Sequence, residues 1–145
     1  MAKFKFKFES VKKVKEALET KTKKEIAVID NEIEKEKGAK QKLIDETNDI
    51  KKNYSKNSMK ASELQFYKNY GTITEKKIEK IEDNIQKLDV KREVKMDELI
   101  EKKKENKILE KLEENMHIDF NKEQDQVDLK KFDEIATQKF VRRKK

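Results

Sequence analysis

The sequence predicts an all-α protein in which two long antiparallel helices form a coiled-coil hairpin, with the C-terminal helix overhanging the first. Three observations predict this fold. The 145 residues include no Pro and two Gly, too few turn formers for a fold with many tight turns. Charged residues make up 48% and apolar residues 33%, so a globular core of ordinary size is excluded. Apolar residues recur at helical spacing, which indicates long helices rather than a disordered polyelectrolyte.

The first helix is expected over residues 8–54. Its apolar stripe begins at Val11, Val14 and Leu18 and resumes in heptad register at Ile26. Between Leu18 and Ile26 the stripe passes through Thr22 with two successive spacings of four residues, which predicts a stutter where the coiled coil locally unwinds. The stripe then continues at Ile29, Ile33, Leu43, Ile50 and Tyr54, and Gly38 is expected to be a soft spot inside the helix.

A turn is expected over residues 55–61, which have no apolar stripe and are rich in turn formers. Directly after it, Ser62 and Gln65 have the spacing of a capping box, so the second helix is expected over residues 62–141. Gly71 is a tolerated weak point or a short break in this helix. Its seam includes Ile78, Ile81, Ile85, Leu88, Leu99 and Leu109. The same register passes through polar Arg92, Lys95, Lys102 and Asn106, which predicts a weak, hydrated seam in the middle of the helix. Residues 1–145 then form a single domain.

The lengths of the two helices predict an unpaired C-terminal segment. A turn near residue 58 places residue 4 beside about residue 112, because both helices rise about 1.5 Å per residue. About 30 residues, on the order of 45 Å of helix, then have no partner within the chain. This overhang keeps an apolar stripe that points to another protein as its partner: Met116, Phe120, Leu129, Phe132 and Phe140.

The residue types argue against an enzyme, a metal site and a cofactor. There is no Cys, and His117 is the only histidine. Glu114 and His117 have the spacing of one half of a di-iron site, but a chain with 31 acidic residues produces this pair by chance. Carboxylates on long exposed helices are not desolvated enough to have tuned acid–base chemistry.

The charge pattern argues against sequence-specific nucleic-acid binding. The net charge of +7 comes from interleaved signs, with an excess of base at the two ends, and almost all the base is Lys. Lys without Arg supports only weak attraction to phosphate. A nonspecific nucleic-acid binder, whose affinity would fall steeply with salt, therefore ranks below the two protein-binding functions considered below. No stretch approaches the roughly 18 apolar residues of a spanning helix, and a soluble protein is expected.

Two aromatic groups could be either structural or functional. Phe4, Phe6 and Phe8 alternate with Lys. This stretch is either a frayed chain end or an apolar patch at the same end of the hairpin as the overhang. The second group is a cluster of three aromatic residues near the turn, whose helical spacing is typical of seam residues. Only part of such a cluster can face one slim helix, so the remaining rings would be exposed and could bind a partner. This second group consists of Phe66, Tyr67 and Tyr70.

Three stretches of the chain resemble the flagellar export protein FliJ family. They are Met1–Phe8 leading into Val11 and Val14, then Ala61-Ser62 with Tyr67, Tyr70 and Glu75–Ile78, and finally Lys130–Ala136 with the basic residues at 142–145. The resemblance extends over essentially the whole chain. It implies a fold similar to the coiled-coil stalk, the γ subunit, of rotary ATP synthases.

The resemblance also implies a cytoplasmic component of the flagellar type III export apparatus, peripheral to its membrane-embedded part. In this family, the stalk binds the hexameric export ATPase and promotes its assembly and activity. It also contacts the export gate through the linker of the large membrane subunit of the gate, and it binds export chaperones. The implied gate-binding residues are Leu43, Ile50, Tyr70 and Ile81. The implied ATPase-binding residues are Lys130, Lys131, Phe132, Asp133, Glu134, Ile135, Ala136, Phe140, Arg142 and Arg143, with Phe4, Phe6 and Phe8 as further candidates.

A structural adaptor or scaffold unrelated to secretion fits the residue pattern equally well without the resemblance. If such a protein self-associates, sedimentation shows an oligomer that depends on concentration. The export stalk is instead expected to be an elongated monomer in isolation.

Overall fold

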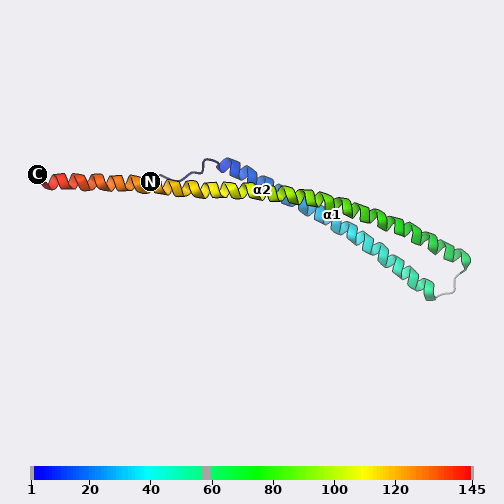
Figure 1. Ribbon diagram of the computed structural model, residues 1–145. Coiled ribbons are helices and arrows are strands. Elements are labelled where there is room, and N and C mark those ends of the chain that lie inside the picture. The colour runs from blue at the N-terminus through cyan, green and yellow to red at the C-terminus, as the bar shows by residue number, and fades with distance from the viewer. Residues whose placement is uncertain (1, 57–59, 145) are drawn as a thin grey trace. The chain divides into compact units, whose positions relative to one another are not determined.

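The protein is built from two long α-helices, shown in the computed structural model of Figure 1, which describes residues 2–56 and 60–144. Helix α1 spans Glu9–Lys56 and helix α2 spans Ala61–Lys144. The two helices pack against each other and the C-terminal one is longer, so the predicted fold class is confirmed. The turn expected over residues 55–61 includes residues 57–59, which lie outside the described residues.

The start of α2 differs slightly from the capping box expected at Ser62. The backbone carbonyl of Lys60 accepts hydrogen bonds from the amides of Glu63 and Leu64, both at 3.1 Å. Because this carbonyl accepts the first helical bonds, the helix begins at Ala61 and Ser62 lies in its first turn. Acidic Glu63 near this end, and basic residues in the last turn, have the signs that complement the helix dipole.

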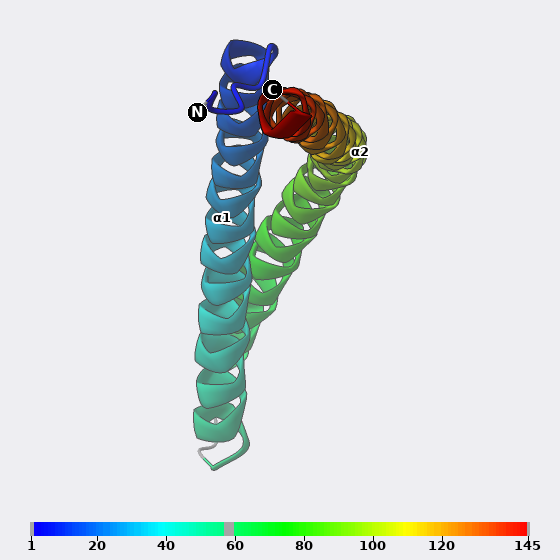
Figure 2. The same cartoon turned by 90° about the vertical axis from the view of Figure 1, so that its left-hand side faces the viewer.

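The chain divides into two compact units. The terminal unit consists of Met1–Glu19 and Glu101–Lys145, and the central unit is Thr20–Ile100. Within the central unit, the halves of α1 and α2 run side by side (Figure 2). Ion pairs show that the two helices are antiparallel, because later residues of α1 pair with earlier residues of α2. The pairs join Glu25 to Lys95 at 2.8 Å, Asp30 to Arg92 at 2.6 Å, and Lys40 to Glu82 at 3.0 Å.

The seam of the central unit combines apolar and polar side chains. Ile26, Ile33 and Leu99 are buried in it, and so are Thr22 and Thr74. Several predicted seam residues are half-buried: Ile29, Leu43, Ile50, Ile78, Ile81, Ile85 and Leu88. Both glycines lie inside helices with ordinary backbone angles, so Gly38 and Gly71 do not break them.

In the terminal unit the seam is mostly polar, which differs from the prediction. Val11, Val14 and Leu18 are 45%, 59% and 40% exposed. The half-buried positions are Lys12, Lys15 and Glu19, which reach Thr22 at unbroken three-and-four spacing, so the predicted stutter is absent. The reason is that residues of α2 pair with these polar side chains. Lys12 pairs with Glu113 at 2.6 Å, Lys15 pairs with Glu105 at 2.8 Å, and the Asn106 amide donates to the Glu19 carboxylate.

The unpaired segment of α2 is shorter than predicted. The ring of Phe4 lies against His117 and Phe120, rather than near residue 112, with ring centroids 4.6 and 5.6 Å apart. Residues 2–6 are not helical, and a non-helical chain spans up to about 3.3 Å per residue instead of about 1.5 Å. Half-buried positions on α2 therefore continue to Gln124, and only residues 125–144 are exposed throughout. This segment measures roughly 30 Å.

Replacing Gly38 by Ala should stabilise the protein by about 1 kcal/mol, because Ala loses less backbone entropy than Gly inside a helix. A Cβ atom at position 38 would meet no atom within 4 Å, so no clash opposes the gain. Urea unfolding followed by circular dichroism should show a higher midpoint. Gly38→Pro is the opposite control and should lower it, and an unchanged or lower midpoint for Gly38→Ala would contradict the prediction.

Candidate partner-binding surfaces

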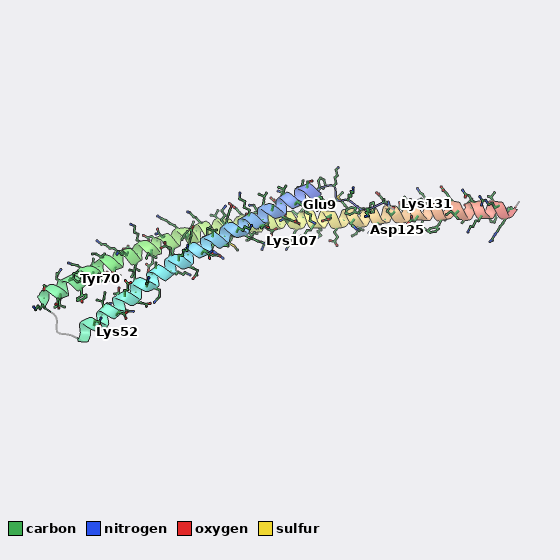
Figure 3. The ribbon with its side chains drawn as sticks, turned by 180° about the vertical axis from the view of Figure 1, so that it is seen from behind. Glu9, Lys52, Tyr70, Lys107, Asp125 and Lys131 are labelled. Atoms are coloured by element: carbon green, nitrogen blue, oxygen red, sulfur yellow. The ribbon has the colours of Figure 1, made fainter. Side chains whose placement is uncertain are left out.

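The exposed C-terminal segment of α2, residues 125–144, carries a continuous apolar stripe. Leu129, Phe132 and Phe140 are 62%, 68% and 60% exposed, and Ala136 completes a spacing of three, four and four. Such spacing places the four side chains on one face of the helix. Asp125 and Lys131, labelled in Figure 3, lie on this stretch, where no other helix runs alongside. The face is open to a partner along its full length.

This segment also carries basic residues, which are concentrated in its last turn. Lys130 and Lys131 directly precede Phe132, and the last turn contains Arg142, Arg143 and Lys144. The Lys144 ammonium lies 5.0 Å from the centre of the Phe140 ring, a cation–π contact. Cations at this end also interact favourably with the helix dipole, so part of the basic charge has a structural role.

The N-terminal phenylalanines are largely engaged within the terminal unit. Phe4 packs on His117 and Phe120, and Phe6 is 8% exposed. Phe8 is 36% exposed, and its ring lies 5.8 Å from that of Phe6. Phe4 therefore attaches the non-helical start of the chain to α2, beside which this stretch runs (Figure 1). Phe8 is the most exposed of the three rings.

His117 has a structural environment. Its ring meets the edge of Phe4, and the side-chain nitrogen of Asn121 lies 3.1 Å from Nδ1. Within residues 2–56 and 60–144, no group of three or more His, Cys, Asp or Glu side chains could hold a metal ion.

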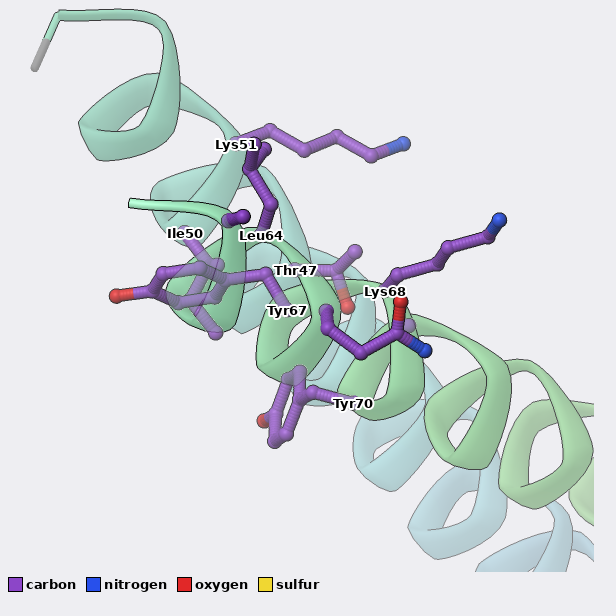
Figure 4. A pocket seen from close by; sticks show the side chains of 10 residues that line it. Thr47, Ile50, Lys51, Leu64, Tyr67, Lys68 and Tyr70 are labelled. Atoms are coloured by element: carbon purple, nitrogen blue, oxygen red, sulfur yellow. The ribbon is translucent and has the colours of Figure 1, made fainter. Parts of the chain in front are cut away.

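A second candidate surface is a groove between the end of α1 and the start of α2, in the central unit (Figure 4). We call it the tip groove. Its volume is about 440 Å³. Thr47 and Ile50 of α1 line it together with Tyr67 and Tyr70 of α2, so two tyrosines face an isoleucine across the groove. The full lining is Thr47, Ile50, Lys51, Ala61, Leu64, Gln65, Tyr67, Lys68, Tyr70 and Gly71.

The residues that the FliJ resemblance associates with gate binding divide between this groove and the seam. Ile50 and Tyr70 line the tip groove, whereas Leu43 and Ile81 are half-buried along the helix pair. Phe66 is 65% exposed, and its ring lies 5.7 Å from that of Tyr67. The three tip aromatics thus divide into two rings that line the groove and one that is exposed.

Sequence reasoning missed several residues of these surfaces. Leu64 and Lys68 line the tip groove. Leu64 could have been indicated by helical spacing, because it lies three residues before Tyr67 and residues three or four apart share a helix face, and Lys68 follows four residues after Leu64. Thr47 lines the groove as well, at a polar position between the predicted seam residues Leu43 and Ile50. The outward position of Val11, Val14 and Leu18 was also missed, although each of them directly precedes a polar residue that takes the seam position instead.

The electrostatics of the helix pair are ordinary for exposed ion pairs. The hydrogen bond from Lys12 to the Glu113 carboxylate raises the pKa of Lys12 above its ordinary value. Hydrogen bonds to Glu25 and Glu98 raise the pKa of Lys95 in the same way. Both shifts stabilise lysine charges that are already present at neutral pH, so neither creates a general acid or base for catalysis.

The geometry defines a class of protein: a hairpin of two long packed helices with apolar side chains exposed on its outer faces. None of the described helices is sufficiently long and apolar to cross a membrane. Among known families, the family described as FliJ, Flagellar FliJ protein, matches residues 4–145, and the chain therefore belongs to it. The chain is accordingly a non-enzymatic component of the flagellar export apparatus. No curated protein and no solved structure matches the chain.

Replacing Phe4 by Ala should release the start of the chain, because Phe4 supplies the ring contacts with His117 and Phe120. Trypsin should then cleave after Lys5 and Lys7 about tenfold faster, while helicity measured by circular dichroism stays the same. Phe132→Ala is the matched control, since that ring is 68% exposed, and it should leave cleavage unchanged. Equal cleavage rates for Phe4→Ala and the unmodified chain would contradict the anchoring role of Phe4.

Proposed function

We propose that this protein is the stalk of the flagellar export apparatus, and that it binds the hexameric export ATPase through the exposed face of residues 125–144. The observation that carries the proposal is the apolar stripe of Leu129, Phe132, Ala136 and Phe140 on a helical segment, residues 125–144, that is exposed throughout, in a chain of the FliJ family. Large exposed aromatic residues at this spacing are typical anchors of helix recognition.

The stalk promotes ATPase activity through assembly. A single helix is slim enough to enter the central hole of a ring, where several subunits contact it together. Such a ligand binds the closed ring more tightly than the separate subunits, and by linkage it shifts the equilibrium toward the ring. Lys130, Arg142 and Arg143 add charge that favours acidic residues on the ring subunits. This function needs no catalytic group on the stalk itself.

The proposal includes two further partners on the cytoplasmic side of the export apparatus. The tip groove, with Ile50, Tyr67 and Tyr70, is proposed to bind the large export-gate subunit. An apolar groove flanked by tyrosine hydroxyl groups suits a peptide segment that presents one apolar anchor. Export chaperones are the third partner, and the family resemblance alone supports them.

Truncation of the chain to residues 1–128 should abolish stimulation of ATP turnover by the export ATPase, because it removes the exposed apolar stripe. The measurement is the ATP hydrolysis rate of the ATPase with the full-length chain, with the truncated chain and without either. Phe132→Glu should raise the concentration needed for half-maximal stimulation at least about tenfold. Helicity should remain close to that of the full-length protein in the point variant.

Gln138→Glu is the matched control for Phe132→Glu. Gln138 lies on the opposite side of the same helical segment, and its replacement by Glu introduces the same charge away from the apolar stripe. Stimulation should therefore stay unchanged. Full stimulation by the 1–128 chain would exclude the C-terminal segment from the mechanism. If neither form stimulates and sedimentation shows an oligomer that depends on concentration, the self-associating adaptor is the correct function instead.

Leu64→Glu should weaken binding to the linker of the export-gate subunit at least about tenfold, because it places a charge in the tip groove. Calorimetric titration of the linker peptide into the full-length variant measures the effect. Ile73→Glu is the matched control, since Ile73 is 54% exposed on the same helix and does not line the groove. Equal losses in both variants would contradict a binding site in the groove.

A further inference from the structure

The apolar stripe of residues 125–144 lies on the side of α2 opposite to the side that the rest of the terminal unit covers. Half-buried Met116, Phe120 and Gln124 mark the covered side, where Phe4 packs on Phe120. Leu129 follows Phe120 by nine residues, which is about two and a half helical turns, so its side chain points the opposite way. A second helix can therefore lie along the stripe without meeting the start of the chain.

Charged residues continue the apolar row at both of its ends. Asp125 lies four residues before Leu129, and Arg143 lies three residues after Phe140, so both share the face of the row. Asp125 is exposed on the stretch of α2 along which no other helix runs (Figure 3). The row thus begins with an acidic residue and ends with a basic one.

One flank of the row repeats this order of charges. Asp128 and Arg142 each directly precede a residue of the row, so both are rotated from it by about 100° in the same direction. Lys139 follows Asp128 by eleven residues, which is about three turns, and lies on the same flank. Ile135, which is 50% exposed, lies between them on this flank.

The opposite flank carries Asp133 near the middle of the segment and Lys144 at its end. The Lys144 ammonium lies 5.0 Å from the centre of the Phe140 ring. The other charged residues of the segment are rotated well away from the row: Lys130, Lys131 and Glu134.

The charges near the row are complementary to those of a second, antiparallel copy of the same segment. When two such helices pair about a two-fold axis near residue 134, residues equally distant from the axis face each other. Asp125 of one copy then faces Arg143 of the other. Equal rotations from the row point to the same side of an antiparallel pair, so Asp128 faces Lys139 and Arg142. The symmetry forms each of these contacts twice.

The apolar residues fit the same register. Phe132 of one copy faces Ala136 of the other, so a large side chain meets a small one. Leu129 faces Phe140, and the Ile135 side chains of the two copies meet beside the axis. A parallel pair in register would instead place each charge of the row against its own like charge, so the charges select the antiparallel arrangement.

We propose that residues 125–144 of two copies of this chain pair as an antiparallel, two-fold symmetric coiled coil. Two contacts oppose the pairing. The Asp133 side chains of the two copies approach each other near the axis, and Lys122 lies one turn from the contact of Asp125 with Arg143. The opposite charges at both ends outnumber these contacts, and both ends also gain apolar burial.

The dimer is expected to be weak and reversible. Each copy contributes one helix of 20 residues, and exposed ion pairs contribute little each. The dissociation constant is therefore expected to be on the order of 100 μM, so the chain at micromolar concentration is the monomer expected of the stalk. A second copy and the ATPase ring compete for the stripe, a consequence that rests on the proposed function. The pairing itself does not.

Sedimentation equilibrium of the full-length chain tests the pairing. Between about 10 μM and about 1 mM, the average mass should rise from that of a monomer toward that of a dimer. Added salt should weaken the dimer, because its ion pairs are exposed. Asp133→Asn should strengthen it, because this change removes the like-charge contact near the axis.

Charge reversal tests the register and the direction of the two helices. The Arg142→Glu/Arg143→Glu and Asp125→Arg/Asp128→Arg variants should each dimerise at least about tenfold more weakly, since each brings like charges together at both ends. An equimolar mixture of the two variants should dimerise as the unmodified chain does, because opposite charges then face each other again at both ends. Circular dichroism verifies that both variants remain helical.

Gln138→Glu/Val141→Glu is the matched control for Arg142→Glu/Arg143→Glu. It also introduces two glutamates near the end of the segment, but on the side of the helix away from the row, where Val141 is 51% exposed. The control should dimerise as the unmodified chain does.

Three results would overturn the proposal: a chain that stays monomeric at about 1 mM, a mixture of the two charge-reversed variants that stays monomeric, or a control that dimerises as weakly as Arg142→Glu/Arg143→Glu. No ATPase is present in these measurements. A monomeric chain that stimulates the ATPase would therefore overturn the dimer alone, and a dimer that fails to stimulate it would overturn the stalk function alone.

Discussion

The scarcity of apolar side chains is the constraint on which this structure depends. Among the described residues, the buried apolar side chains are Phe6, Ile26, Ile33 and Leu99. With so little to bury, the chain forms a narrow seam between two helices rather than an enclosed core, and polar residues and ion pairs complete that seam. In the part of the chain that the structure describes, this seam encloses too little volume to desolvate a catalytic group. Recognition must therefore occur on outer helix faces, which is consistent with a non-enzymatic export component.

Polar residues in the seam affect both the pairing of α1 with α2 and the exposure of the neighbouring apolar side chains. Thr22, Thr74 and Asn106 are buried, and Asn106 donates a hydrogen bond to the Glu19 carboxylate. Polar seam residues typically reduce stability but restrict a helix pair to one register. In the terminal unit they have a further consequence. Because Lys12 and Lys15 pair with carboxylates on α2, Val11 and Val14 lie outside the seam and are exposed.

The sequence predicted most of the helical framework correctly, because heptad spacing depends only on local geometry. Ile26, Ile33 and Leu99 are buried as predicted, and Leu129, Phe132 and Phe140 are exposed as the unpaired stripe requires. The prediction was wrong for Val11, Val14 and Leu18, because apolar spacing alone favours them for the seam. Whether they or Lys12, Lys15 and Glu19 face α2 depends on Glu105, Asn106 and Glu113, roughly 90 to 100 residues away in the chain.

The sequence by itself determined two long helices, the turn region between them, the absence of a large core and the apolar face near the C-terminus. These follow from composition and local periodicity. Only the tertiary structure decided the register of the helices, the anchoring of Phe4 on His117 and Phe120, and the tip groove around Tyr67 and Tyr70. It also decided which side of the first turns of α1 faces outward. Each of these depends on contacts between distant segments, and local helix periodicity contains no information about which distant residues meet.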